Sequence, residues 1–174
     1  LTQTYDGTGR IVTATTDPGA LTVHITYDGS STPPINVGTY AVVAAIDDEG
    51  YEGSASGTLT VSKRPITVTA DAKTKVYGDP EPTLTFHVTT GSLVTGDSFA
   101  GALTRVAGEN VGTYAIQQGT LALNNNYVLT YVGANLSITA RPIAVTADAK
   151  TKGYGDPEPA LTYHITTGSL VAGD

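Results

Sequence analysis

The sequence predicts a mainly β protein made of small antiparallel β modules in a tandem, elongated array. Three observations lead to this prediction. Apolar and polar residues alternate with a period of two over short segments rich in Thr, Val, Ile and Tyr, which is the pattern of half-buried strands. Gly, Asn, Asp and Pro interrupt these segments at short intervals, as turns between antiparallel strands require. Finally, a long segment recurs almost unchanged, which is the mark of a repeat architecture.

The repeat has a period of 77 residues, the offset (141 − 64) that aligns residues 141–174 with residues 64–97. Of the 34 aligned positions, 28 are identical, which indicates a tandem duplication. A more diverged copy precedes these two. Its segment LTVHI at 21–25 matches LTFHV at 84–88, and its VGTY at 37–40 matches VGTY at 111–114.

These matches divide the chain into three modules. Residues 1–64 are interpreted as a diverged module that lacks its first strand, and residues 65–140 as a complete module. Residues 141–174 correspond to the N-terminal part of a third module. We expect the junctions at SKRP and TARP, where the last strand of one module should run directly into the first strand of the next.

Alternation also predicts the core of the middle module. The expected core residues are Leu84, Phe86, Val88, Tyr114, Ile116, Leu129, Leu136 and Ile138. An Ig-like sandwich is the favoured topology. The alternative is a β-grasp-like small sheet with one short helix, because GDSFAGALTR at 96–105 is a weak helical candidate with Asp97 as its N-cap.

The hexapeptide YGDPEP occurs at residues 77–82 and again at 154–159. Gly78 can adopt a positive φ, while the two prolines restrict the backbone and remove two donors. This predicts a turn followed by a stiff extended segment. Asp79 and Glu81 could instead bind Ca²⁺, but that ion requires six to eight oxygen ligands and no dedicated loop is present. We therefore interpret the motif as a structural turn and predict no metal site.

Three histidines occupy one equivalent position in the alignment above: His24, His87 and His164. No second ligand is spaced to complete a metal site, and no nucleophile and acid are arranged around them for catalysis. They are interpreted as exposed strand histidines, and Asn124, Asn125 and Asn126 as a tight turn. We predict that the protein is not an enzyme, with no catalytic, cofactor-binding or metal residues and no cofactor.

Composition excludes two classes of partner. The net charge is −7, the isoelectric point is about 4.7, and there are 9 basic residues in 174. Binding to nucleic acid or to anionic lipid needs a concentrated basic surface. The longest aliphatic run, residues 41–46, is too short to span a bilayer, so membrane insertion is not expected.

Several segments of the middle module resemble, in order and spacing, the MBG-type tandem repeats of bacterial adhesin-like surface proteins: YGDPEP, LTFHV, GSLVTGD, ENVGTYAI, NNNYVLTY and ANLSITARPI. The N-terminal segment resembles the related YDG/MBG-like variant. This resemblance implies a secreted or cell-surface bacterial protein with no assigned catalytic residues. Two functions follow from it: a structural stalk whose partners are the adjacent modules of the same polypeptide, or an adhesive module that binds a glycan or a host cell-surface ligand.

Overall fold

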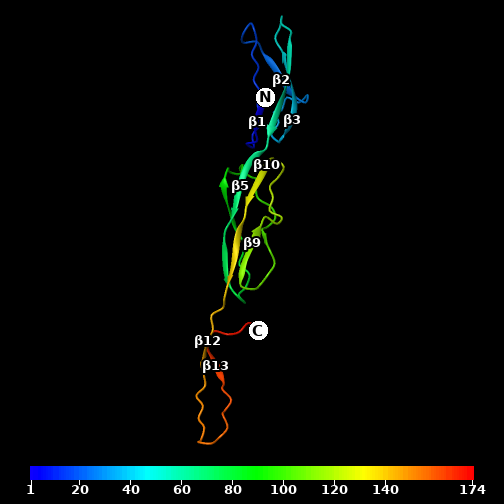
Figure 1. The fold of residues 1–174 in the computed structure, drawn as a ribbon. Helices are drawn as coiled ribbons and strands as arrows, with labels where there is room; N and C mark the ends of the chain where they lie inside the picture. Colours follow the sequence, from blue (N-terminus) through cyan, green and yellow to red (C-terminus); the bar gives the residue numbers. More distant parts are fainter.

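The computed structural model describes residues 1–174, which form thirteen strands and no helix. Three groups of strands follow one another along one long axis, with the N-terminal group at one end and a two-stranded hairpin at the other (Figure 1). The protein is therefore an all-β tandem array, as the sequence predicts. No element of the structure is a helix that could cross a membrane.

The N-terminal unit is a single four-stranded sheet. Its strands are β1 (Thr2–Thr4), β2 (Val23–Tyr27), β3 (Gly38–Ile46) and β4 (Ser54–Ser62). The strand order is β1-β4-β3-β2, in which β3 pairs antiparallel with both neighbours and β1 runs parallel to β4. Alternation along β3 and β4 buries Val42, Leu59 and Val61 on the same side.

The middle unit contains seven strands in two sheets, with orders β10-β5-β7 and β6-β11-β9-β8. The strands are β5 (Arg64–Ala70), β6 (Lys73–Val76), β7 (Phe86–Thr90), β8 (Thr104–Arg105), β9 (Gly112–Gln117), β10 (Tyr127–Val132) and β11 (Ala134–Thr139). Only one residue, Lys63, separates β4 from β5. The N-terminal and middle units are thus joined strand to strand, without a linker.

A long parallel ribbon runs through both sheets of the middle unit. Strand β10 pairs with β5 and β11 pairs with β6, always between residues 63 apart in the sequence (127 with 64, 139 with 76). The two strand pairs therefore form one continuous ribbon that passes from the first sheet into the second. Strand β7 then pairs with β5, and β9 pairs with β11.

The C-terminal hairpin repeats the first pairing of the middle unit. Strand β12 (Ala144–Ala147) pairs antiparallel with β13 (Tyr163–Thr167). Ala144 lies opposite Thr167, just as Thr67 lies opposite Thr90 in the β5–β7 pair, and each pair has an irregularity at the next residue. The near-identical sequences therefore adopt the same register.

Two expectations about topology were wrong. Three strand pairs are parallel, so the sheets are mixed rather than wholly antiparallel. Period-two alternation shows which face of a strand is buried, but it carries no information on strand direction. Residues 96–105 are not helical, because Gly96 and Gly101 have φ of 96° and 79°, outside the right-handed helical region. The alternative fold with one short helix is therefore not formed.

The alignment of His24 with His87 was also wrong. Strand β2 pairs with β3 in the N-terminal unit in the same way as β8 pairs with β9 in the middle unit. Tyr27 lies opposite Val42 in the first pair, and Arg105 lies opposite Ile116 at the corresponding position of the second. Strand β2 thus corresponds to β8, whereas His87 lies on β7, next to β5. A five-residue match within alternating, Thr-rich segments was too short to establish which strands correspond.

One hydrophobic core extends from the N-terminal unit into the middle unit. Leu59 and Val61 of β4 belong to the same buried cluster as Ile66 and Val68 of β5, all at most 1% exposed. A second, smaller cluster lies around Leu136 in the middle unit. Because one core crosses the junction, we expect the two units to stabilise each other.

The expected core of the middle unit is correct only for its inner strands. Ile116, Leu136 and Ile138 are buried, whereas Val88 is 39% exposed. The prediction that Val88 is buried was wrong, because β7 is an edge strand of its sheet. The remaining expected residues are half-buried: Leu84, Phe86, Tyr114 and Leu129.

Candidate functional site: the junctions between units

The two junctions are built from the same pair of turns. A turn that contains a tyrosine and a glycine, here called the Tyr-Gly turn, follows the last residue of β1 and of β6; its sequence is Tyr-Asp-Gly at residues 5–7 and Tyr-Gly-Asp at residues 77–79. An acceptor turn, at residues 94–97 and 171–174, has the sequence Val-x-Gly-Asp and is closed by a hydrogen bond from the Asp amide to the Val carbonyl, at 3.0 Å and 3.1 Å. Each Tyr-Gly turn contacts the acceptor turn of the unit that follows it.

At the first junction, a carboxylate holds two tyrosines together. The hydroxyls of Tyr5 and Tyr127 both donate to Asp97 Oδ2, at 2.9 Å and 2.6 Å. The two rings pack edge to face with centroids 5.5 Å apart, a favourable aromatic geometry. Asn124 Nδ2 donates to the other oxygen of Asp97 at 2.8 Å. A side chain of the N-terminal unit is thereby tied to two turns of the middle unit.

This environment alters the ionisation of all three groups. Burial, and then the hydrogen bond to Asp97, raises the pKa of Tyr5 and of Tyr127. The hydrogen bond from Tyr127, followed by those from Tyr5 and Asn124, lowers the pKa of Asp97. The junction therefore contains an ionised carboxylate between neutral phenols at neutral pH, which is the protonation state that its hydrogen bonds require.

Asn126 makes a second link across the first junction. Its Oδ1 accepts the Val37 amide at 2.9 Å, and its Nδ2 donates to Asn36 Oδ1 at 3.0 Å. The Asn124 to Asn126 segment is a turn, as expected, since the Tyr127 amide donates to the Asn124 carbonyl. Its role at the junction was missed, because the partners lie about ninety residues away.

The second junction repeats the contact between a tyrosine and an aspartate, with the aspartate 77 residues later in the sequence. The Tyr77 hydroxyl donates to Asp174 Oδ1 at 2.9 Å, and this hydrogen bond raises the pKa of Tyr77. Arg141, which follows β11, donates to the Tyr77 carbonyl at 3.2 Å and to Asp79 Oδ1 at 3.1 Å. Asp79, expected to be only a turn residue, is thus an ion-pair partner between units.

A glycine is required where the two turns meet. Gly7 and Gly78 both have φ of 83°, a conformation that L residues with a side chain rarely adopt. A Cβ at Gly7 would lie 2.3 Å from a methyl carbon of Val94, and a Cβ at Gly78 would lie 2.3 Å from one of Val171. Glycine therefore serves both the turn and the close approach of the next unit.

Glu81 of the YGDPEP motif belongs to an ion network inside the middle unit. Lys75, whose side chain is 5% exposed, donates to Glu81 at 3.0 Å and to Glu109 at 2.6 Å. Arg105 binds Glu81 through two nitrogens and donates to Glu109 at 2.5 Å, with its guanidinium 5.4 Å from the centre of the Tyr114 ring. Such forked, charge-assisted contacts hold side chains in defined positions.

The network shifts the pKa of each member in the direction that favours its charged form. The Arg105 hydrogen bond, followed by that of Lys75, lowers the pKa of Glu81 from 4.5 to about 2. Hydrogen bonds from Lys75 and Arg105 lower the pKa of Glu109, and those carboxylates in turn raise the pKa of Lys75. The sequence contained a partial signal for this network, since a Lys precedes a Glu by six residues at both 75–81 and 152–158.

The network predicts an acid-sensitive middle unit. Because the pKa of Glu81 is lower in the folded protein, its contribution to stability is present above about pH 4.5 and is lost as the pH falls toward about 2. We expect Glu81→Gln to lower the melting temperature at pH 7 and to have little effect near pH 2. Calorimetry over this range tests it. Glu158→Gln is the matched control, because Glu158 pairs only with Lys152 and is 83% exposed; equal effects of the two substitutions at pH 7 would contradict the prediction.

Two of the histidines each pair with a carboxylate that lies just after the end of the neighbouring strand. His87 Nδ1 lies 2.7 Å from Asp71 Oδ1, and Thr85 Oγ1 donates to Asp71 Oδ2 at 2.5 Å. The same contacts recur at His164 and Asp148. Both imidazoles are exposed, and a threonine hydroxyl is the third member of each group, so the arrangement is that of a strand-to-strand link.

The carboxylates of the acidic motifs bind donors of the protein itself, and no three His, Asp or Glu side chains converge as a metal site would require. We therefore expect that millimolar Ca²⁺ leaves the melting temperature unchanged compared with NaCl of equal ionic strength. A rise of several degrees that EDTA reverses would identify Asp79 and Glu81 as ligands instead.

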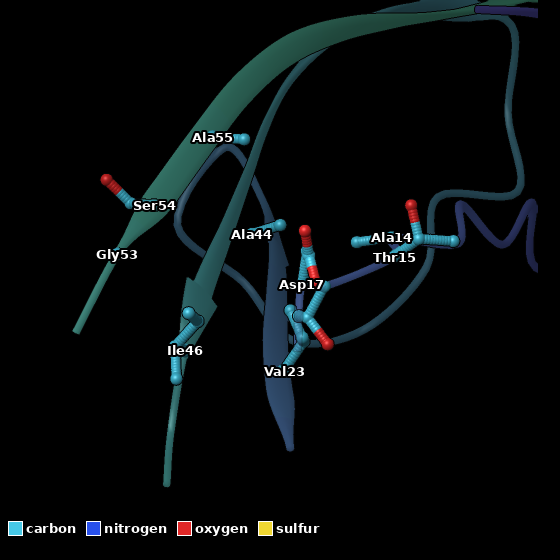
Figure 2. A pocket seen from close by; sticks show the side chains of 10 residues that line it. Ala14, Thr15, Asp17, Val23, Ala44, Ile46, Gly53, Ser54 and Ala55 are labelled. Carbon is cyan, nitrogen blue, oxygen red and sulfur yellow. The ribbon is translucent and has the colours of Figure 1, made fainter. Parts of the chain in front are cut away.

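Two shallow hollows lie on the N-terminal unit. The first, about 270 Å³, lies beside the ends of β2, β3 and β4, and its lining includes Ala14, Ala44 and Ile46, with Asp17 among them (Figure 2). The second, about 410 Å³, is lined by Tyr27, Tyr40 and a proline-containing loop. The ionisable side chains that line them are Asp17 in the first, and Tyr27, Asp28 and Tyr40 in the second.

Comparison with family models gives two adjacent matches. Residues 1–65 match the model described as MBG domain, and residues 66–137 match the model described as MBG domain (YGX type). Comparison with curated proteins and with solved structures gives no match. The two matched ranges meet between residues 65 and 66, two residues into β5 and just after the junction of β4 and β5.

Proposed function

Since the chain belongs to the MBG-domain family, whose modules occur in adhesin-like surface proteins, we propose that it serves as a structural stalk. In this role, stacked units hold another part of a secreted or cell-surface bacterial protein at a distance from the cell. The proposal includes that the chain catalyses no reaction and that its direct partners are neighbouring units of the same polypeptide.

The observation that carries the proposal is the repetition of the junction. Tyr5 with Asp97, and Tyr77 with Asp174, make the same contact between successive units. At the first junction the units also share a core and are joined strand to strand. A stalk needs such defined junctions, because a chain of units on flexible linkers would collapse to a shorter mean length.

Small-angle scattering tests the stalk. We expect the chain to be elongated in solution, because the junctions restrict bending between units. A compact particle of this length would have a radius of gyration on the order of 16 Å, and a measured value near that figure would contradict the proposal.

A glycine pair isolates the contribution of the junction. Gly78→Ala should shorten the mean particle, because the new methyl group would collide with Val171. Gly155→Ala is the matched control: Gly155 occupies the same motif position with φ of 86°, and nothing lies within 4 Å of a Cβ there. Equal scattering profiles for the two variants would show that the Gly78 contact does not hold the units in line.

A second candidate function is direct binding of a glycan or another cell-surface ligand. The observation in its favour is the hollow lined by Tyr27 and Tyr40, since aromatic rings can stack on sugars. Their hydroxyls are already used within the unit: Tyr27 Oη accepts the Val12 amide at 2.8 Å, and Tyr40 Oη donates to the Asn36 carbonyl at 2.9 Å. A glycan array probed with the chain and with Tyr40→Ala separates the two functions, because only an adhesive module would give a signal that this substitution removes.

A further inference from the structure

A third Tyr-Gly turn, residues 154–156, has no partner in this chain. Its sequence is the same as that of residues 77–79. Tyr154 is fully exposed, with a relative exposure of 109%, whereas Tyr77 is half-buried and bonded to Asp174. The turn lies in the segment between β12 and β13, which forms the end of the molecule opposite the N-terminal unit (Figure 1).

The turn has nevertheless adopted the conformation of its bound counterpart at residues 77–79. Gly155 has φ of 86°, compared with 83° for Gly78. The Asp156 amide donates to the Gly153 carbonyl at 3.2 Å, as the Asp79 amide donates to the Val76 carbonyl at 3.0 Å. A turn that is already formed loses little conformational entropy when it binds.

The neighbouring Lys-Glu pair is preserved as well. Lys152 donates to Glu158 at 2.6 Å, in the manner of Lys75 and Glu81. The free turn is therefore a copy of the element that makes the second junction, with an open space where Gly78 meets Val171.

The chain itself contains no free acceptor for this turn. The acceptor turn at 94–97 already binds Tyr5, and the one at 171–174 already binds Tyr77. A second copy of the same chain would likewise present two occupied acceptors. At both junctions the acceptor turn lies in the unit that follows the Tyr-Gly turn in the sequence. The partner of residues 154–156 should therefore lie in a unit that follows the C-terminal hairpin.

We propose that residues 154–156 bind the Val-x-Gly-Asp turn of a further unit joined after the C-terminal hairpin. The Tyr154 hydroxyl donates to the Asp carboxylate of that turn, and Gly155 contacts its Val side chain. This inference rests on the stalk function and deepens it. The Tyr-Gly turn and the Val-x-Gly-Asp turn form a directional pair that joins each unit only to the unit that follows it.

The test extends the chain by one period. A second copy of residues 98–174 is appended after Asp174, which continues the 77-residue repeat and supplies an acceptor turn at the corresponding distance. Melting temperatures are then compared for Tyr154→Phe in the original and in the extended chain. We expect no change in the original chain, and in the extended chain a decrease of the same size as that caused by Tyr77→Phe.

Two further variants make the outcome decisive. Gly155→Ala introduces the same positive-φ strain in both chains but should lower the melting temperature further in the extended chain, because only there would a Val side chain face it. Tyr163→Phe is the control and should change neither chain, because the equivalent position in the middle unit is naturally Phe86.

An equal effect of Tyr154→Phe in the two chains would overturn the proposal, as would an appended segment that unfolds independently of the rest. Either result would be distinguishable from a failure of the stalk function, because small-angle scattering of the original chain tests the stalk function separately. A particle that is elongated but insensitive to Tyr154→Phe in the extended chain would leave the stalk intact and exclude this turn as its connector.

Discussion

Replacing Leu136 with alanine should lower the free energy of unfolding of the middle unit by about 2–5 kcal/mol, the usual range for a buried leucine. Leu136 is 0% exposed and lies at the centre of the second core cluster, on a strand with a neighbour on each side. A domain is stabilised by only about 5–15 kcal/mol in total, so this single cavity could unfold a unit of this size.

Chemical denaturation monitored by circular dichroism measures the effect. Leu161→Ala is the matched control, because it removes the same atoms from a side chain that is 87% exposed. We expect that control to behave like the unmodified chain. A loss at Leu161 comparable to that at Leu136 would mean that the second core cluster does not exist in solution.

Replacing Asp97 with alanine should separate the N-terminal unit from the middle unit. The substitution leaves the hydroxyls of Tyr5 and Tyr127 without their acceptor, and both residues are at most 5% exposed. An unpaired buried polar group costs about 1–3 kcal/mol. Asp97 links the two units in addition to the core that they share, so its loss should weaken their coupling. We expect the N-terminal unit, which is a single sheet, to melt at a lower temperature than the middle unit, as a separate transition.

Differential scanning calorimetry resolves the two transitions, and hydrogen exchange assigns them to β4 or β11. Asp47→Ala serves as the control, because Asp47 is an exposed residue directly after β3, at the end of that strand opposite to Gly38, which pairs with Val61 near the junction. If the Asp97 variant still melts in one transition at the original temperature, the two tyrosines do not couple the units.

Acidification should reproduce part of this effect without a mutation. The pKa of Asp97 is lowered by its three hydrogen-bond donors, so the junction is stabilised by the ionised carboxylate and is weakened as the pH falls below the ordinary pKa of an aspartate. The Asp97 variant should therefore be less sensitive to acid than the unmodified chain.

The sequence by itself determined the local structure and the tandem order of this protein. Alternation identified the strands, and it placed Ile116, Leu136 and Ile138 in the core, because β9 and β11 each have a neighbour on both sides. It also identified the turn at Gly78, since glycine next to paired X-Pro residues restricts the backbone locally. These features depend on residues close together in the chain, which a single sequence displays directly.

Only the tertiary structure decided which segments meet. Strand alternation is the same for parallel and antiparallel neighbours, so the ribbon of β5 and β6 with β10 and β11 could not be inferred, nor could the exposure of Val88 on an edge strand. The YGDPEP motif was read correctly as a turn, but its tyrosine binds a carboxylate 97 residues away and its glutamate binds Arg105. The first contact arises from packing between units and the second from packing within the middle unit, and no local pattern of residues encodes either of them.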